Sequence, residues 1–228
     1  MKDLTKGKPS KLILAFAIPI FMANILQLTY SIVDTRIVGS YLGENTLAAV
    51  GATTTLSNLM IGFLMGLANG FAIITAQKFG ARDYAGVKKS FALSIKMGCT
   101  IAIVISIVCL LFLRQILGFL NVSKDLMGMS VSYIFIIIAG LVATFLYDAC
   151  AAALRALGDT VTPLVSSSLE MIGKIVIAFT LVPLLGYTGV IVAEPLVWFI
   201  MVIPLLVKIY TMPVLRKQPV SVSLKNDE

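Results

Sequence analysis

The chain has 228 residues, of which 59% are hydrophobic and only 13% are charged. A soluble domain carries about 25% charged residues, so this composition excludes a water-facing globular surface of normal polarity. The formal net charge of +7 comes from basic residues that flank long apolar runs. We therefore interpret the charge as a membrane-topology signal and expect no nucleic-acid partner.

The apolar runs predict an all-α protein of about six transmembrane helices in a lipid bilayer. Backbone amides in hydrocarbon must be bonded within helices or closed barrels, and these runs lack the alternation of barrel strands. The predicted spans are 12–37, 46–77, 86–113, 127–156, 162–183 and 188–210. We expect residues 1–217 to form one six-helix bundle and residues 218–228 to form a polar tail.

The distribution of lysine and arginine predicts the orientation of these helices. With six spans, the most basic segments all fall on one side, which is the cytoplasmic side by the positive-inside rule. These segments are the N-terminal tail, the loop after the second helix and the C-terminal tail. The sequence therefore predicts a multi-pass protein of the cell (inner or plasma) membrane with both termini in the cytoplasm.

No residue pattern in the chain is typical of an enzyme or a metal site. The chain has no histidine, and its three cysteines lie within predicted helices without C-x-x-C spacing. The metalloprotease pattern H-E-x-x-H and the hydrolase pattern G-x-S-x-G are also absent. We therefore expect no catalytic residue, no metal ligand and no cofactor.

Two aspartates inside predicted helices are candidates for function, because a mid-bilayer charge costs roughly 2.5–3.5 kcal/mol and usually faces a partner or a water-filled cavity. Asp34 is either a cavity carboxylate that exchanges a proton, a sodium ion or a cationic substrate, or an interfacial residue beside Arg36. Asp148 is either a second cavity carboxylate or the partner of Arg155, seven positions further along.

The later helices contain three more intramembrane charges. Glu170 and Lys174 are four positions apart with the glutamate first, the favourable order for a structural ion pair on one helix. Glu194 precedes a helix-breaking proline and is a candidate to line an entry path or the substrate cavity. Uncharged polar residues of the first helix also predict a polar seam or a wet cavity, and the substrate-cavity candidates among them are Asn24, Gln27 and Tyr30.

Four stretches of the chain resemble multidrug and toxic compound extrusion (MATE) transporters. They are the first helix at 19–39, which contains Asp34, the segments 42–51 and 77–83, and the Leu-Arg-Ala-Leu-Gly-Asp-Thr stretch at 154–160. Together with the flanking helices, the resemblance covers about residues 5–217.

The resemblance implies a fold of twelve helices in two six-helix halves that work by alternating access. It implies export of small, drug-like and often cationic organic compounds in exchange for H+ or Na+. The aspartate of the family's first helix belongs to its ion-coupling site, and the matching position here is Asp34. The chain holds only one half, so transport would require a homodimer or pairing with another transporter half to rebuild a central cavity.

The last two predicted helices depart from the family's first half. Segments 166–174 and 186–198 resemble the last two helices of the second half. Our hypothesis is that recombination at the shared Gly-Asp-Thr stretch joined helices one to four to helices eleven and twelve.

Two other interpretations stay open. The chain is either a non-transporting remnant or a partner subunit of a full-length transporter, or it is a carrier similar to lipid-linked polysaccharide flippases. A flippase would need several cationic side chains facing the cavity, for which the sequence offers Lys96 and Lys174.

Overall fold

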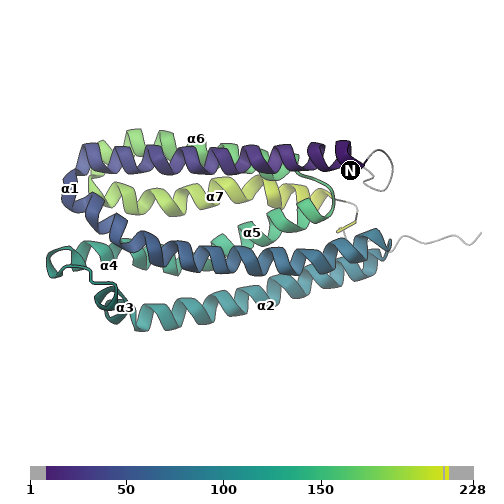
Figure 1. The fold of residues 1–228 in the computed structure, drawn as a ribbon, viewed down its shortest axis with the longest axis horizontal. Helices are drawn as coiled ribbons and strands as arrows, with labels where there is room; N and C mark the ends of the chain where they lie inside the picture. The colour runs from purple at the N-terminus through teal and green to yellow at the C-terminus, as the bar shows by residue number, and fades with distance from the viewer. Residues whose placement is uncertain (1–8, 213, 216–228) are drawn as a thin grey trace, which may run out of the picture.

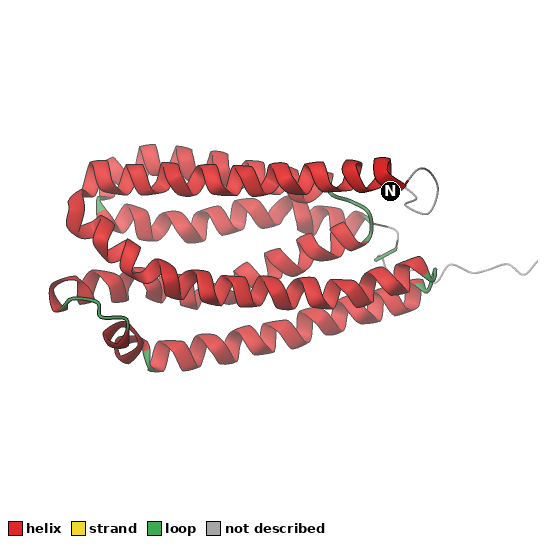
Figure 2. Ribbon diagram, viewed as in Figure 1, coloured by secondary structure: helices red, strands yellow, loops and turns green. Residues whose placement is uncertain are grey.

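In the computed structural model, the described residues are 9–212 and 214–215, and all regular structure within them is α-helical (Figure 2). This confirms the all-α prediction, whereas the predicted tail at 218–228 lies outside the described residues. The helices are α1 (Pro9–Gly80), α2 (Tyr84–Leu111), α3 (Leu113–Phe119), α4 (Lys124–Ala139), α5 (Leu141–Ala156), α6 (Val161–Leu185) and α7 (Tyr187–Thr211).

Helix α1 runs the length of the bundle twice. Figure 1 shows it leaving the N-terminal end, bending at the far end and returning. Two of its stretches, Ser10–Thr29 and Glu44–Gly80, are long and apolar enough to cross a membrane. The first two predicted spans therefore belong to one continuously helical element. Gly39 and Gly43 lie between the two stretches, where their low helix propensity favours a bend.

The fourth predicted span, 127–156, is broken in the structure. It forms α4 and α5, which meet at Gly140 with a bend of 44°. A Cβ atom on Gly140 would lie 1.9 Å from Cζ3 of Trp198, so the indole ring of α7 occupies the space beside the break. Counting the bent pair as one span, the described residues contain up to six candidate membrane spans, in agreement with the prediction.

Helices α6 and α7 form a tight hairpin at the predicted turn. Gly186 connects them with a φ of 58°, which glycine adopts without a steric penalty. A Cβ on Gly189 would lie 2.6 Å from the carbonyl oxygen of Leu181, so the two helices approach closely at their junction. This hairpin brings the charged residues of α6 beside those of α7.

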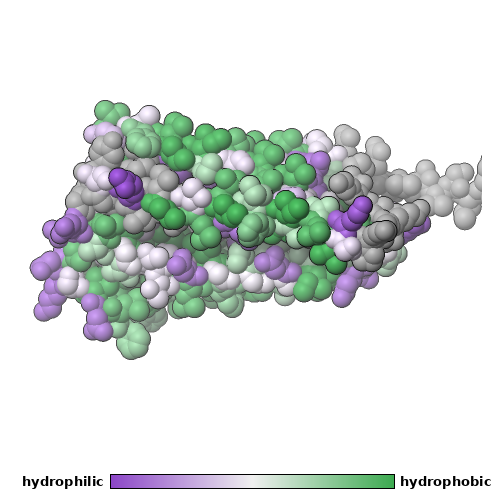
Figure 3. Space-filling model, turned by 45° about the horizontal axis from the view of Figure 1, so that its top comes forward, coloured by the Kyte–Doolittle hydropathy of each residue, from purple (hydrophilic) through white to green (hydrophobic). Residues whose placement is uncertain are grey.

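Large apolar side chains lie both inside the bundle and on its outer surface. Phe145, Leu64 and Ile134 are fully buried where α1, α4 and α5 pack together. Leu59 and Phe199 are 70% and 75% exposed, which suits lipid and not water. Figure 3 shows this hydrophobic surface along the middle of the molecule, with hydrophilic residues mostly gathered toward its two ends.

Small hydroxyl residues link the helices through hydrogen bonds. In a lipid environment such bonds between helices add to close packing, because apolar burial alone gives little preference over lipid. The linking contacts are Ser106 Oγ to the Ile138 carbonyl at 2.8 Å, Ser130 Oγ to the Ala49 carbonyl at 3.3 Å, Thr75 Oγ1 with Ser90 Oγ at 3.0 Å, and Ser166 Oγ to the Met201 carbonyl.

The turn between α5 and α6 is held by Asp159. Its Oδ1 accepts a hydrogen bond from the Thr162 amide at 3.0 Å, and its Oδ2 accepts one from the Thr162 hydroxyl at 2.8 Å. Oδ2 also pairs with Lys208 Nζ of α7 at 3.2 Å. Burial of the Asp159 carboxyl opposes its ionisation, but the bonds from Thr162 and Lys208 outweigh burial and lower its pKa.

Replacing Gly98 by alanine should destabilise the bundle. The added Cβ would lie 1.8 Å from Cζ of the fully buried Phe145, and overpacking of this kind costs roughly 1–3 kcal/mol. The matched control is Gly62→Ala, because a Cβ on Gly62 meets no atom within 4 Å. We expect Gly98→Ala alone to lower the thermal unfolding temperature in detergent. Equal melting of the two variants would contradict the packing that we describe.

The Asp159 contacts should make stability depend on pH. Because the folded pKa of Asp159 is lowered, its contribution is present above the unfolded value of about 3.9 and is lost as the pH falls below it. Asp159→Asn should lower the free energy of unfolding at neutral pH by about 1 kcal/mol, the usual scale of a capping bond. The stability of this variant should also fall less steeply as the pH is lowered. Thermal melts of both proteins between pH 7 and pH 3 test this, with the exposed Asp125→Asn as control.

Candidate functional site

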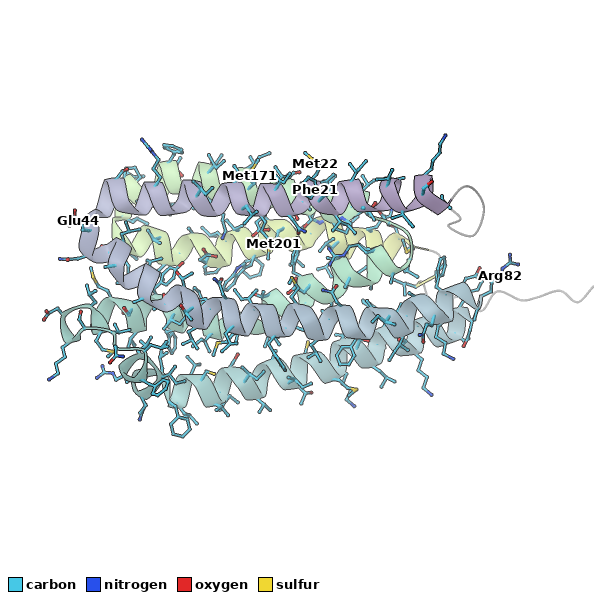
Figure 4. All side chains as sticks on the ribbon, in the orientation of Figure 1. Phe21, Met22, Glu44, Arg82, Met171 and Met201 are labelled. Atoms are coloured by element: carbon cyan, nitrogen blue, oxygen red, sulfur yellow. The ribbon has the colours of Figure 1, made fainter. Side chains whose placement is uncertain are left out.

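A cavity lies inside the bundle between helices α4 to α7 and the two parts of α1. We call the part of α1 before its bend the first arm and the part after it the second arm. The volume of the cavity is about 250 Å³. Met201 of α7 is one of its lining residues, and Figure 4 places this residue about midway between Glu44 at one end of the molecule and Arg82 at the other. The cavity therefore lies near the middle of the membrane-spanning length, where many transporters bind their substrates.

Four charged side chains from three helices line this cavity. Asp148 comes from α5, Glu170 and Lys174 come from α6, and Glu194 comes from α7. They share one cavity because Glu170 and Lys174 lie one turn apart on α6, and the tight hairpin sets α7 beside that helix. Apolar surroundings make each charge costly to leave unpaired, so their convergence marks the site.

Lys174 forms an ion pair with Glu194. Lys174 Nζ lies 3.2 Å from Glu194 Oε1, and the two side chains are only 14% and 15% exposed. A partly buried pair of this kind links α6 to α7, and removing one partner leaves a costly charge behind. The predicted pairing of Lys174 with Glu170 within α6 stays a prediction.

Asp148 has a buried carboxylate oxygen, Oδ2, that no hydrogen bond satisfies among the described residues. The neighbouring Tyr147 also lines the cavity, and its hydroxyl forms a hydrogen bond with Ser167 Oγ at 3.0 Å. The Tyr147 contact links α5, which carries Asp148, to α6, which carries Glu170.

The first arm of α1 contributes less to the described cavity than the sequence predicts. Gln27 lines the cavity, whereas Asn24 is exposed and is not among the lining residues. The side chains of Tyr30 and Asp34 lie outside the described residues, although α1 runs through both positions. The role of Asp34 in ion coupling therefore stays a prediction.

Sequence reasoning missed the aromatic wall of the cavity. Tyr133 of α4, Tyr147 of α5 and Trp198 of α7 all line it. Their isolated positions carry no motif. The packing of the Trp198 ring against Gly140 is seen only in the structure. Aromatic faces attract cations, so this wall together with the carboxylates forms a site suited to a cationic group.

The polar residues of the second α1 arm lie on the cavity's rim. Thr54 and Asn58 are exposed and also line the cavity, and Ser57 is buried beside them. The cavity thus opens toward the surface of this arm. A cavity of this size with apolar walls and a few convergent polar groups has the usual features of a ligand site.

Comparisons with known proteins agree with this architecture. Residues 19–180 match the family model described as MatE. The chain is 28% identical over 182 residues to the probable multidrug resistance protein YoeA of Bacillus subtilis (strain 168), which covers 79% of this chain and 38% of that protein. It is 26% identical over 219 residues to the multidrug resistance protein NorM of Vibrio vulnificus (strain YJ016), which covers 92% of this chain and 47% of that one.

Solved structures show the same fold over about half their length. A MATE structure in a straight conformation matches with a TM-score of 0.81 and 25% identity, covering 97% of this chain and 49% of that chain. A transporter of the MOP superfamily from Pyrococcus furiosus matches with a TM-score of 0.82 and 24% identity, covering 99% and 49%. The chain spans less than half the length of the two curated relatives above and about half of these solved chains. Because the MatE model matches well over half of the chain, this protein belongs to the MatE family.

Proposed function

We propose that this protein is a membrane transporter that exports drug-like or cationic organic compounds in exchange for H+ or Na+, without a cofactor. The observation that carries the proposal is the mid-bundle cavity lined by Asp148, Glu170 and Glu194. Intramembrane carboxylates facing a cavity are typical of substrate and ion pathways. The names of the relatives YoeA and NorM describe multidrug resistance proteins, which supports the same conclusion.

We propose Asp34 as the ion-coupling carboxylate. It lies on the first arm of α1, in the stretch that resembles the first helix of MATE transporters, and Gln27 on the same arm lines the cavity. Two helical turns separate Gln27 from Asp34, so both positions lie on the same face of an α-helix. A carboxylate there is suited to exchange a proton or a sodium ion with the cavity.

The active form that we propose contains two halves, either two copies of this chain or one copy with another transporter half. Asn58 is exposed on the second arm of α1, and hydrocarbon gives its side-chain amide no hydrogen-bond partner. Gly62, Gly66 and Gly70 on the same arm have no atom within 4 Å of an added Cβ. Small residues at this spacing let another helix approach closely.

We propose that the protein lies in the cell (inner or plasma) membrane with both termini on the cytoplasmic side. Figure 1 places the start of α1, the end of α1 and the end of α7 at the same end of the bundle. Lys11, Lys78 and Lys208 lie at these three helix ends. A common basic end is the arrangement expected for the cytoplasmic side.

Efflux of a fluorescent cation from a pump-deficient bacterial host tests the proposed function. The chain should lower ethidium accumulation, and Asp34→Asn should abolish most of this effect because the side chain can no longer exchange a proton. Asp125→Asn is the matched control, since Asp125 is exposed at the start of α4, away from the cavity. All signals are normalised to the amount of protein in the membrane.

Failure of the intact chain to export any of several cations, at normal membrane abundance, would contradict stand-alone transport. That result would favour the remnant or partner-subunit interpretation. Co-expression with a full-length relative would then show which of these two applies.

Gly62, Gly66 and Gly70 form an open surface on the second arm of α1, which we call the glycine face. This face should be needed for pairing of two copies. Gly66→Leu places a bulky side chain where the partner helix would approach, so the dimer fraction in lipid nanodiscs should fall severalfold. The control is Gly128→Leu, because Gly128 of α4 is equally open but lies outside the glycine face. Single-molecule photobleaching gives both fractions. An unchanged dimer fraction in Gly66→Leu would exclude this face as the interface.

A further inference from the structure

The cavity contains more carboxylates than cations among its lining side chains. Asp148, Glu170 and Glu194 face Lys174 as the single cationic residue of the lining set. The Lys174 ammonium lies against Glu194 at 3.2 Å. Asp148 is on another helix, and its buried Oδ2 has no hydrogen-bond partner among the described residues. A further positive group in the cavity would be stabilised beside this unpartnered Asp148 oxygen.

Lysine is suited to leave such a pair. Its ammonium is a compact charge on a flexible four-carbon stem, and it does not hold a carboxylate through the two fixed bonds that arginine makes. Lys174 Nζ donates a hydrogen bond to Glu194 Oε1 at 3.2 Å. A second cation entering the cavity would therefore compete with Lys174 for the same carboxylate.

The remaining walls indicate the chemical class of that cation. Tyr133, Tyr147 and Trp198 line the cavity, and aromatic faces attract organic ammonium groups. A volume of about 250 Å³ also exceeds what a single dehydrated metal ion would fill. The walls and the volume together favour a small organic ammonium as the ligand.

We infer that Lys174 is a tethered counter-cation that occupies Glu194 until an organic ammonium group enters the cavity, binds beside Asp148 and displaces it. This inference rests on the proposed function and deepens it, because it identifies a residue that sets the affinity of the cavity for its cationic ligand. The ligand exchanges one ion pair for another, so little net charge has to be added to the apolar interior. Entry of a neutral molecule would leave the Lys174–Glu194 pair in place.

The test measures binding of tetraethylammonium to the purified full chain in detergent by isothermal titration calorimetry. Lys174→Gln removes the tethered cation at similar volume, and we expect binding to tighten on the order of tenfold, equivalent to about 1.4 kcal/mol. Glu194→Gln frees Lys174 to pair with the other carboxylates, so binding should weaken. If the Lys174–Glu194 pair only holds α6 and α7 together, both variants should instead bind tetraethylammonium more weakly.

Lys174→Arg keeps the charge and holds Glu194 more firmly, which provides a second variant if Lys174→Gln does not fold. It should bind tetraethylammonium more weakly than the native chain. Binding that is unchanged or weaker in a folded Lys174→Gln, or unchanged in Lys174→Arg, would overturn the inference. Asp125→Asn, far from the cavity, controls for general effects of charge.

Repeating the titration in NaCl and in KCl of equal concentration distinguishes a site for an organic ammonium group from a site for Na+. Equal tetraethylammonium affinity in the two salts supports an organic ammonium site, whereas competition by Na+ alone would overturn the assignment of ligand class. Failure of transport is distinguishable from failure of this inference. A chain that exports nothing but binds tetraethylammonium with the expected changes contradicts only the proposed function.

Discussion

Hydrocarbon offers no hydrogen-bond partner to a peptide group, and the rest of this structure depends on that constraint. Each membrane-crossing stretch must bond its own backbone, which the helices do, and each must present apolar side chains to lipid. The outer surface therefore carries residues such as Leu59 and Phe199 that would be unfavourable in water. A charged side chain is costly in hydrocarbon, so the charged residues of the membrane-crossing helices that line the cavity lie where helices face one another.

Glycines determine how closely those helices approach. Gly98 accepts the ring of Phe145, and Gly140 accepts the indole of Trp198, so two large aromatic side chains occupy space that any other residue would fill. The second contact coincides with the 44° break between α4 and α5. Since Trp198 and Tyr147 also line the cavity, the same close contacts that hold the helices together shape the wall of the site.

The charged residues of the cavity connect packing to function. The Lys174–Glu194 pair joins α6 to α7 in a cavity that Asp148 and Glu170 also line. The mutual attraction of such a pair offsets part of the cost of burying both charges. The chain belongs to the MatE family and covers about half of a solved MATE structure.

The sequence by itself determined the all-helical membrane class and the approximate spans, because length and apolar character can be counted along one dimension. The family was visible as a resemblance of particular stretches, such as 154–160. The sequence also identified Gln27, Asp148, Glu170, Lys174 and Glu194, since a charge or amide within an apolar run is visible without a structure. Only the tertiary structure decided that Asp148 and Glu194 share one cavity, that Lys174 reaches Glu194 on the next helix, and that Trp198 packs on Gly140. These contacts depend on the rotation and approach of separate helices, and spacing along one helix contains no information about either.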